Sequence, residues 1–133
     1  MVSKSKKILS EIAAGELLDK ISILEIKLEK IKAKNERDEI NKEYKILKEI
    51  EKYSIKTTDK INELSRSIKE VNLLLWDIED QLRICEKNQD FGKNFINLAR
   101  SVYFNNDKRS KIKAEINKLL GSNIKEIKQY EKY

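Results

Sequence analysis

An uninterrupted series of apolar residues between Ile61 and Cys85 constrains the fold most. The spacing alternates between three and four residues, and the series consists of Ile61, Leu64, Ile68, Val71, Leu75, Ile78, Leu82 and Cys85. This period places every member on one face of an α-helix and lasts long enough for coiled-coil-like packing. We therefore expect a helix over residues 59–87 with a length of about 43 Å.

The composition favours long helices in the rest of the chain. Hydrophobic and charged residues each make up 39% of the 133 residues, and there are only three glycines and no proline. Little therefore interrupts a helix, and the apolar share suits narrow buried stripes better than a wide core or a sheet. The chain length suits a single domain that spans residues 1–133.

Periodic apolar residues predict three further helices, at about 15–34, 38–54 and 91–120. Short connections between long helices make neighbouring helices antiparallel. The predicted fold class is all-α: an elongated antiparallel helical bundle with a long coiled-coil-like hairpin. The hairpin consists of the helices at 59–87 and 91–120, and the peripheral tails are 1–14 and 122–133.

Polar residues and glycine mark the expected helix ends. A break is expected within residues 34–38, with Asn35 or Asp38 as the N-cap of the second helix. The N-caps expected later are Thr57 or Thr58 and Asp90, and Gly121 is expected to end the last helix. The segment 71–78 adds a second apolar face through Leu73, Leu74 and Trp76, so we expect it at the centre of the fold.

Several classes of protein are excluded or disfavoured by composition. The absence of histidine excludes Ser–His nucleophiles and His-based metal sites, and the single cysteine cannot form an internal disulfide. No apolar run approaches the ~20 residues of a membrane span, so we expect a cytoplasmic protein without membrane insertion. The net charge is +6, but lysines and acidic residues are interleaved, as is typical of solvated helix surfaces. Nucleic-acid binding is therefore not favoured.

Asn105 and Arg109 occupy positions where the apolar register of the last helix calls for buried residues. One interpretation is structural, because a buried polar residue can fix the register and number of helices. Another is that the helix bends here and Asp107 caps a new one. The functional interpretation is a polar pocket, in which Arg109 faces an anion or the carboxylates of the helix at 59–87.

The segment LWDIEDQLR, residues 75–83, carries those carboxylates. Glu79 and Asp80 have helical spacing to Arg83, which is typical of exposed ion pairs. Asp77 follows Trp76 on the second apolar face and would need a cation such as Lys20 or Arg109 if it were buried. Trp76 itself is either a core anchor or a stacking platform for a sugar or base.

A metal site built from carboxylates alone is the least favoured interpretation of the acidic residues. Bundles that bind two iron ions use Glu-x-x-His motifs, which this chain cannot form. We therefore expect no metal and no other cofactor. The carboxylates considered are Glu16, Asp19, Asp77 and Asp80.

Four segments together resemble a small all-helical bacterial and phage domain family of unknown function. They are GELLDKISILEIKLEKI, LWDIEDQLRICE, DFGKNFINLARSVY and NDKRSKIKAEINKLLGS, at residues 15–31, 75–86, 90–103 and 106–122. The resemblance implies a link with bacteria and phages that make or modify surface polysaccharides, and it implies no specific activity. The polar positions to which it points are Glu16, Asp19, Lys20, Trp76, Glu79, Asp80, Asn106, Asp107 and Arg109.

The sequence is consistent with two functions. The first is a helical interaction or scaffold module, accessory to carbohydrate or surface-polysaccharide metabolism. The alternative is an enzyme that binds a small anion or sugar phosphate inside the bundle, with arginines stabilising charge. We expect a homodimer, because an elongated bundle leaves apolar stripes for a second chain, and a protein partner or a small anionic or sugar ligand fits either function. The candidate ligand-binding residues are Glu16, Asp19, Lys20, Trp76, Asp77, Glu79, Asp80, Arg83, Asn105, Asn106, Asp107 and Arg109.

Overall fold

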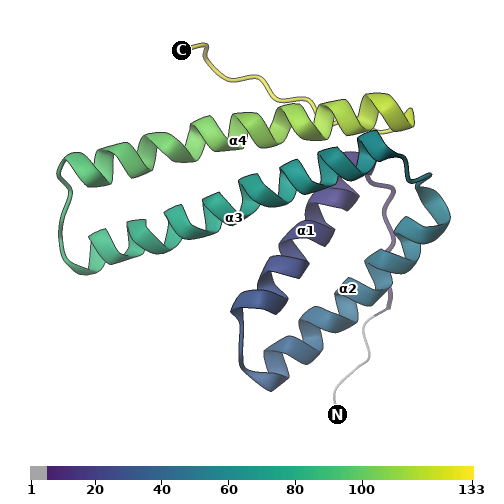
Figure 1. The fold of residues 1–133 in the computed structure, drawn as a ribbon, viewed down its shortest axis with the longest axis horizontal. Coiled ribbons are helices and arrows are strands. Elements are labelled where there is room, and N and C mark those ends of the chain that lie inside the picture. Colours follow the sequence, from purple (N-terminus) through teal and green to yellow (C-terminus); the bar gives the residue numbers. More distant parts are fainter. Residues whose placement is uncertain (1–5) are drawn as a thin grey trace.

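The computed structural model describes residues 6–133, which form four α-helices and no strand (Figure 1). This confirms the predicted all-α bundle. The helices are α1 (Ala14–Lys30), α2 (Lys34–Ser54), α3 (Asp59–Lys87) and α4 (Lys93–Leu120).

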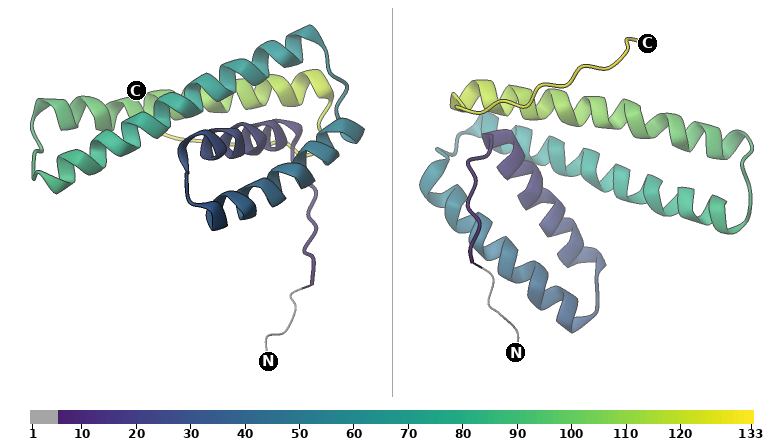
Figure 2. Two further views of the ribbon diagram at one scale, coloured as in Figure 1. Left: turned by 60° about the horizontal axis from the view of Figure 1, so that its bottom comes forward. Right: turned by 180° about the vertical axis from the view of Figure 1, so that it is seen from behind.

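The helices form two hairpins of unequal length, α1 with α2 and α3 with α4 (Figures 1 and 2). Helix α1 packs across both α3 and α4, whereas within residues 6–133 α2 packs against α1 and no other helix. With 17 residues against 29 in α3, α1 is about 18 Å shorter and covers only part of the long hairpin. We call residues 59–72 and 109–120 the packed end and residues 73–87 and 93–108 the bare end.

The apolar series in α3 behaves as predicted. Six of its members are buried, namely Ile61, Leu64, Ile68, Leu75, Ile78 and Cys85, while Val71 and Leu82 are half-buried. The same face also buries Asn72, a polar residue next to the series. Because α3 contacts both α1 and α4, its buried face is wider than a single seam.

The centre of the core lies closer to the packed end than the sequence suggested. The main cluster of buried residues is Leu17, Leu18, Ile21, Ile61, Leu64 and Ile116. Residues 71–78 contribute less than expected, since Trp76 is half-buried and Leu74 is exposed. The reason is that α1 crosses the hairpin before this segment and leaves one side of it uncovered.

The break between the first two helices falls earlier than predicted. Helix α1 ends at Lys30 and α2 begins at Lys34, after the N-cap Ala33, so neither Asn35 nor Asp38 is the N-cap. The guanidinium of Arg37 donates to the carbonyl oxygens of Leu28 and Ile31. Because this contact satisfies carbonyl groups at the end of α1, the helix can stop there without a glycine.

The other helix ends follow the sequence more closely. The Thr58 hydroxyl accepts a hydrogen bond from the Ile61 amide at 3.2 Å and caps α3 as predicted. Helix α4 begins two residues late, with Gly92 as its N-cap, and the Asp90 carboxylate accepts from the Gly92 amide instead. Gly121 ends α4 in the left-handed conformation with φ of 59°, which confirms the predicted stop.

The C-terminal segment, residues 122–133, contains no helix and runs back along α4 from its end (Figures 1 and 2). It contacts α4 through the Glu126 carboxylate and through the Tyr133 hydroxyl, which donates to Asp107. Among residues 6–133, no helix has both the length and the apolar character needed to cross a membrane.

Candidate functional site

A buried polar cluster connects α1 to the long hairpin at the packed end. Asp19 of α1 is only 3% exposed, and its carboxylate accepts a hydrogen bond of 2.7 Å from the Asn72 amide group. The same amide nitrogen donates to the Ser22 hydroxyl at 2.8 Å, and that hydroxyl donates to the Asp19 carbonyl oxygen. These bonds compensate the desolvation of three polar side chains and fix α1 on α3.

Two cations from α4 face the Asp19 carboxylate. The Arg109 guanidinium lies 3.9 Å from Asp19 and donates to the Asn72 side-chain oxygen at 3.3 Å. The Lys113 ammonium lies 3.7 Å from the same carboxylate. The expected carboxylates of α3 are therefore not its ion-pair partners, because within residues 6–133 Arg109 pairs with Asp19 of α1. The alternative, that Arg109 faces an anion, stays a prediction.

Lys113 is buried and forms the second centre of the cluster. Its ammonium donates to Glu16 at 2.7 Å and to Glu126 at 2.9 Å. Burial by itself lowers the pKa of Lys113, but the bonds to Glu16 and Glu126 and the charge of Asp19 outweigh this and hold the pKa above its usual value. Lys113 therefore stays charged at neutral pH and acts as a cationic tie rather than as a base.

The N-terminus of α1 is held by one side chain from the end of α4 and one from the C-terminal segment. The Gly15 amide donates to the Asn117 side-chain oxygen at 2.7 Å, and the Ala14 amide donates to the Ser122 hydroxyl at 3.1 Å. A side chain at Gly15 would place its Cβ 2.6 Å from the Lys113 carbonyl oxygen. Glycine is therefore required here because α1 and α4 approach each other closely.

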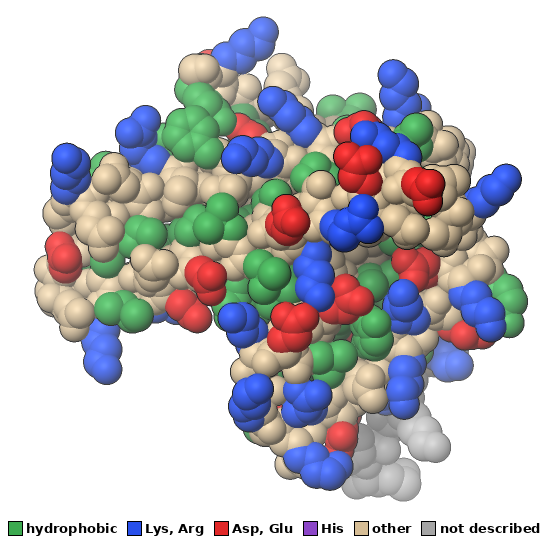
Figure 3. All heavy atoms as spheres, viewed as in Figure 1, with side chains coloured by type: hydrophobic (Ala, Val, Ile, Leu, Met, Phe, Trp, Pro, Cys, Tyr) green, Lys and Arg blue, Asp and Glu red, His purple; other side chains and the backbone are tan. Residues whose placement is uncertain are grey.

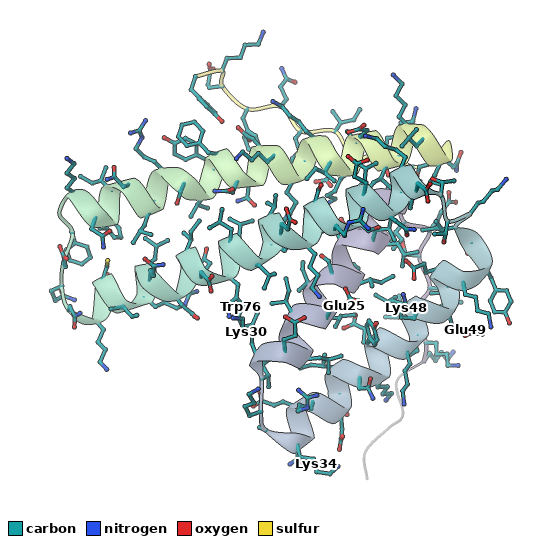
Figure 4. All side chains as sticks on the ribbon, viewed as in Figure 1. Glu25, Lys30, Lys34, Lys48, Glu49 and Trp76 are labelled. Atoms are coloured by element: carbon teal, nitrogen blue, oxygen red, sulfur yellow. The ribbon has the colours of Figure 1, made fainter. Side chains whose placement is uncertain are left out.

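A groove of about 580 Å³ opens beside this cluster, in the angle between α1 and the bare end. Trp76 lies on the side of α3 that faces the last turn of α1 (Figure 4). Asn72 and Arg109 reach the groove from the buried cluster, so its inner wall is fixed by hydrogen bonds. The remaining polar side chains that line it are Glu79, Asp80, Arg83 and Asn106.

The predicted site residues therefore fall into two groups. The structure brings eight of them into the cluster or the groove, namely Glu16, Asp19, Trp76, Glu79, Asp80, Arg83, Asn106 and Arg109. Asp77 is exposed, and neither of its expected cations contacts it, because Arg109 pairs with Asp19 and Lys20 lies 4.0 Å from Glu16. Asp107 accepts a hydrogen bond from Tyr133.

Asn105 is buried in the seam between α3 and α4, as the register predicts, and lies outside the groove lining. Its amide group donates to the Ser101 carbonyl oxygen at 2.7 Å, while its side-chain oxygen has no partner within residues 6–133. Because α4 runs without a break from Lys93 to Leu120, the alternative of a new helix capped by Asp107 is wrong.

Four buried residues of the cluster are not among the predicted site residues: Ser22, Asn72, Lys113 and Asn117. A signal for two of them was present. Polar residues recur every four positions in α4, at Asn105, Arg109, Lys113 and Asn117, which is the spacing of one helix face. Asn72 and Ser22 gave no comparable signal, because each lies singly beside an apolar series.

These observations define the class of protein as an all-α four-helix bundle whose first and last helices are tied by a buried polar cluster. The model of a family of unknown function, DUF6165, matches residues 8–133, and the chain belongs to this family. This agrees with the resemblance to a helical family of unknown function. Comparison with curated proteins and with solved structures found no match.

Proposed function

We propose that the chain is a helical binding module that holds an uncharged sugar residue against Trp76, accessory to carbohydrate or surface-polysaccharide metabolism. The observation that carries this proposal is the composition of the groove. One indole ring lies among side chains that donate and accept hydrogen bonds, including Asn106, Asp80 and Arg83. An aromatic face suits the C–H face of a sugar ring, and polar side chains around it suit hydroxyl groups.

The charges of the groove favour a neutral ligand over a phosphorylated one. Arg109 is matched by Asp19 behind the groove, and Arg83 pairs with Glu79 one turn away. Asp80 adds a further carboxylate to the lining. A phosphate would enter a site whose cations already have acidic partners, which removes much of the electrostatic gain.

The inner wall of the groove is also suited to binding. Asn72 uses both its amide nitrogen and its oxygen within the cluster, and Arg109 is held by two partners. A ligand therefore meets side chains whose positions are already fixed, and little ordering entropy is lost when it binds. The cluster orients the wall, while Trp76 and the outer polar residues contact the ligand.

The fluorescence of Trp76 offers a direct test, because it is the only tryptophan in the chain. We expect a neutral sugar identified on a glycan array to shift the Trp76 emission, and Trp76→Ala to weaken binding by at least about tenfold in calorimetry. Tyr53→Ala is the matched control, since this exposed aromatic residue of α2 lies outside the groove. Equal affinities of Trp76→Ala and wild type would refute the proposal.

The alternative, an enzyme that binds a sugar phosphate or small anion, is favoured by one observation: Arg83 and Arg109 line the same groove. Paired ligands separate the two ideas. Glucose and glucose 1-phosphate differ only in the phosphate group, so tighter binding of the phosphate that Arg83→Met abolishes would support the anion site. Turnover of the bound phosphate would then establish an enzyme.

We also propose a cytoplasmic homodimer in which the bare ends of two hairpins pack in a coiled-coil-like manner. The bare end exposes Leu74, Ile84 and Ile96, and in Figure 3 hydrophobic side chains reach the surface there between charged ones. Leu74 lies about 200° from Trp76 around α3, so pairing through Leu74 leaves the groove free. Light scattering should give twice the chain mass of 15.7 kDa at micromolar concentration. A monomer mass would overturn the dimer.

A further inference from the structure

We infer that the site takes a linear oligosaccharide of several units, because the Trp76 groove continues over α4 into a second groove built by the C-terminal segment. This inference rests on the proposed function and extends it. The second groove lies between α4 and residues 128–133 and has a volume of about 1160 Å³, larger than the Trp76 groove. A single sugar ring against Trp76 would leave this second groove empty.

The two grooves meet on one side of α4. Val102 and Asn106 line both of them, one turn apart on the helix. A ligand that leaves the Trp76 groove past these two side chains therefore enters the second groove directly. The Asn106 amide, with two donors and one acceptor, lies where a link between two sugar units would pass.

Like the first groove, the second combines aromatic rings with hydrogen-bonding side chains, and its charged lining residues are Asp107, Lys111, Lys128, Glu131 and Lys132. Its aromatic lining comes from Tyr103 of α4 and from Tyr130 and Tyr133 of the C-terminal segment. The Tyr133 ring packs edge-on against Tyr103 with 5.4 Å between ring centroids, which fixes its orientation. Within residues 6–133 Tyr130 makes no such ring contact. Tyr130 and Tyr133 are both 75% exposed, so the ring face of Tyr130 is available for a ligand. Each groove therefore has an aromatic platform, Trp76 in the first and Tyr130 in the second.

Lys113 ties the walls of both grooves together. Its ammonium binds Glu126 of the C-terminal segment and lies 3.7 Å from Asp19, the carboxylate that also holds Arg109 in the Trp76 groove. At the far end of the segment, the Tyr133 hydroxyl donates to Asp107. The segment is thus anchored on both sides of Tyr130, and one buried cation positions the two parts of the surface.

The length of the oligosaccharide is the variable that tests this inference. Using the whole 133-residue chain, we would measure calorimetric affinities for a neutral oligosaccharide series of one to six units, built from the sugar that shifts Trp76 emission. We expect the affinity to rise by about tenfold or more from the disaccharide to the hexasaccharide. Tyr130→Ala should abolish this gain for the hexasaccharide. The matched control is Tyr53→Ala, because Tyr53 lies on α2 and is 76% exposed.

The possible failures point to different proposals. If Trp76→Ala weakens every ligand but affinity is independent of length and of Tyr130, the continuous groove is wrong and the binding module stands. If length matters but Tyr130→Ala and Tyr53→Ala behave alike, the ligand takes another path and the inference is also overturned. If the wild-type chain binds no neutral sugar on the array, both proposals fall.

Discussion

The two ends of the α3/α4 hairpin have similar sequence patterns but different surroundings. At the packed end, α1 covers the hairpin, Ile68 and Ile116 have no exposed surface, and charged groups such as Asp19 are buried with partners. At the bare end, the same two helices contact mainly each other, and Ile84 and Ile96 are more than half exposed. A regular apolar seam therefore specifies a pair of helices, and a third helix decides where that pair becomes a core.

This difference also separates stability from binding. Buried hydrogen bonds at the packed end hold α1, α3 and α4 in place, and the groove begins where α1 stops covering the hairpin. At the packed end, polar side chains are held by buried hydrogen bonds whose rearrangement costs free energy. At the bare end, half-exposed side chains can contact a ligand. Substitutions placed at matching positions of the two ends test this division.

The largest contrast is expected between two isoleucines of α4. Ile116→Ala removes a side chain that is fully buried at the packed end and should lower the free energy of unfolding by about 2–5 kcal/mol. Ile96→Ala, at the bare end, should change it by less than about 0.5 kcal/mol. Urea unfolding followed by circular dichroism measures both. Equal losses would contradict the division, and a loss at Ile96 that depends on protein concentration would indicate the proposed dimer.

The two glycines outside the α4 C-cap offer the next contrast. Gly15→Ala places a Cβ within 3 Å of two Lys113 backbone atoms, so α1 and α4 must separate, at a cost of about 3 kcal/mol. Gly92→Ala meets only the Asp90 carboxylate at 3.4 Å. Because alanine is a poorer N-cap than glycine, it should cost up to about 1 kcal/mol. Thermal unfolding of both variants is the measurement. A neutral Gly15→Ala would mean that α1 sits farther from α4 than described.

Substitutions of two arginines, Arg109 and Arg83, are expected to give a smaller difference in the free energy of unfolding. Arg109→Met leaves the Asn72 oxygen without its donor and Asp19 with one cation fewer, while Lys113 stays beside Asp19. We expect a loss of about 2 kcal/mol in the free energy of unfolding. Arg83→Met removes only an exposed pair with Glu79 and should cost a few tenths, below about 0.5 kcal/mol. An Arg109→Met variant as stable as wild type would show that the guanidinium contacts with Asp19 and Asn72 do not stabilise the fold.

The smallest effect is expected at the C-terminal segment. The hydrogen bond from Lys113 is the main reason that the pKa of Glu126 lies below its ordinary value of 4.5. The stabilisation is therefore present above pH 4.5 and is lost as the pH falls through the lower pKa of the folded state, because the unfolded chain takes up the proton first. Since Glu126 is partly exposed, we expect less than about 1 kcal/mol.

Glu126→Gln should remove that pH dependence, whereas Glu131→Gln should keep it. The free energy of unfolding, measured by urea titration between pH 3 and 6 for both variants, provides the comparison. A wild-type slope that survives Glu126→Gln would assign the pH dependence to another carboxylate.

Periodicity made much of the fold predictable, and the candidate site less so. The α3 series, the Thr58 cap and the Gly121 stop all depend on residues close in sequence, and each is confirmed. The break after α1 was misplaced because Arg37 satisfies its terminal carbonyl groups from nine residues away. Trp76 and Arg109 were identified as candidates, but the carboxylate that faces Arg109 comes from a helix whose angle to the hairpin no local pattern specifies.

The sequence by itself determined that the chain is helical, where its long helices run, and that polar residues interrupt the seam at Asn105 and Arg109. Only the tertiary structure decided which end of the hairpin is covered and which carboxylates meet Arg109 and Lys113. The physical reason is range. Helix formation depends on neighbours three or four residues apart, whereas the position of α1 depends on close backbone packing at Gly15 and on hydrogen bonds between residues more than fifty positions apart.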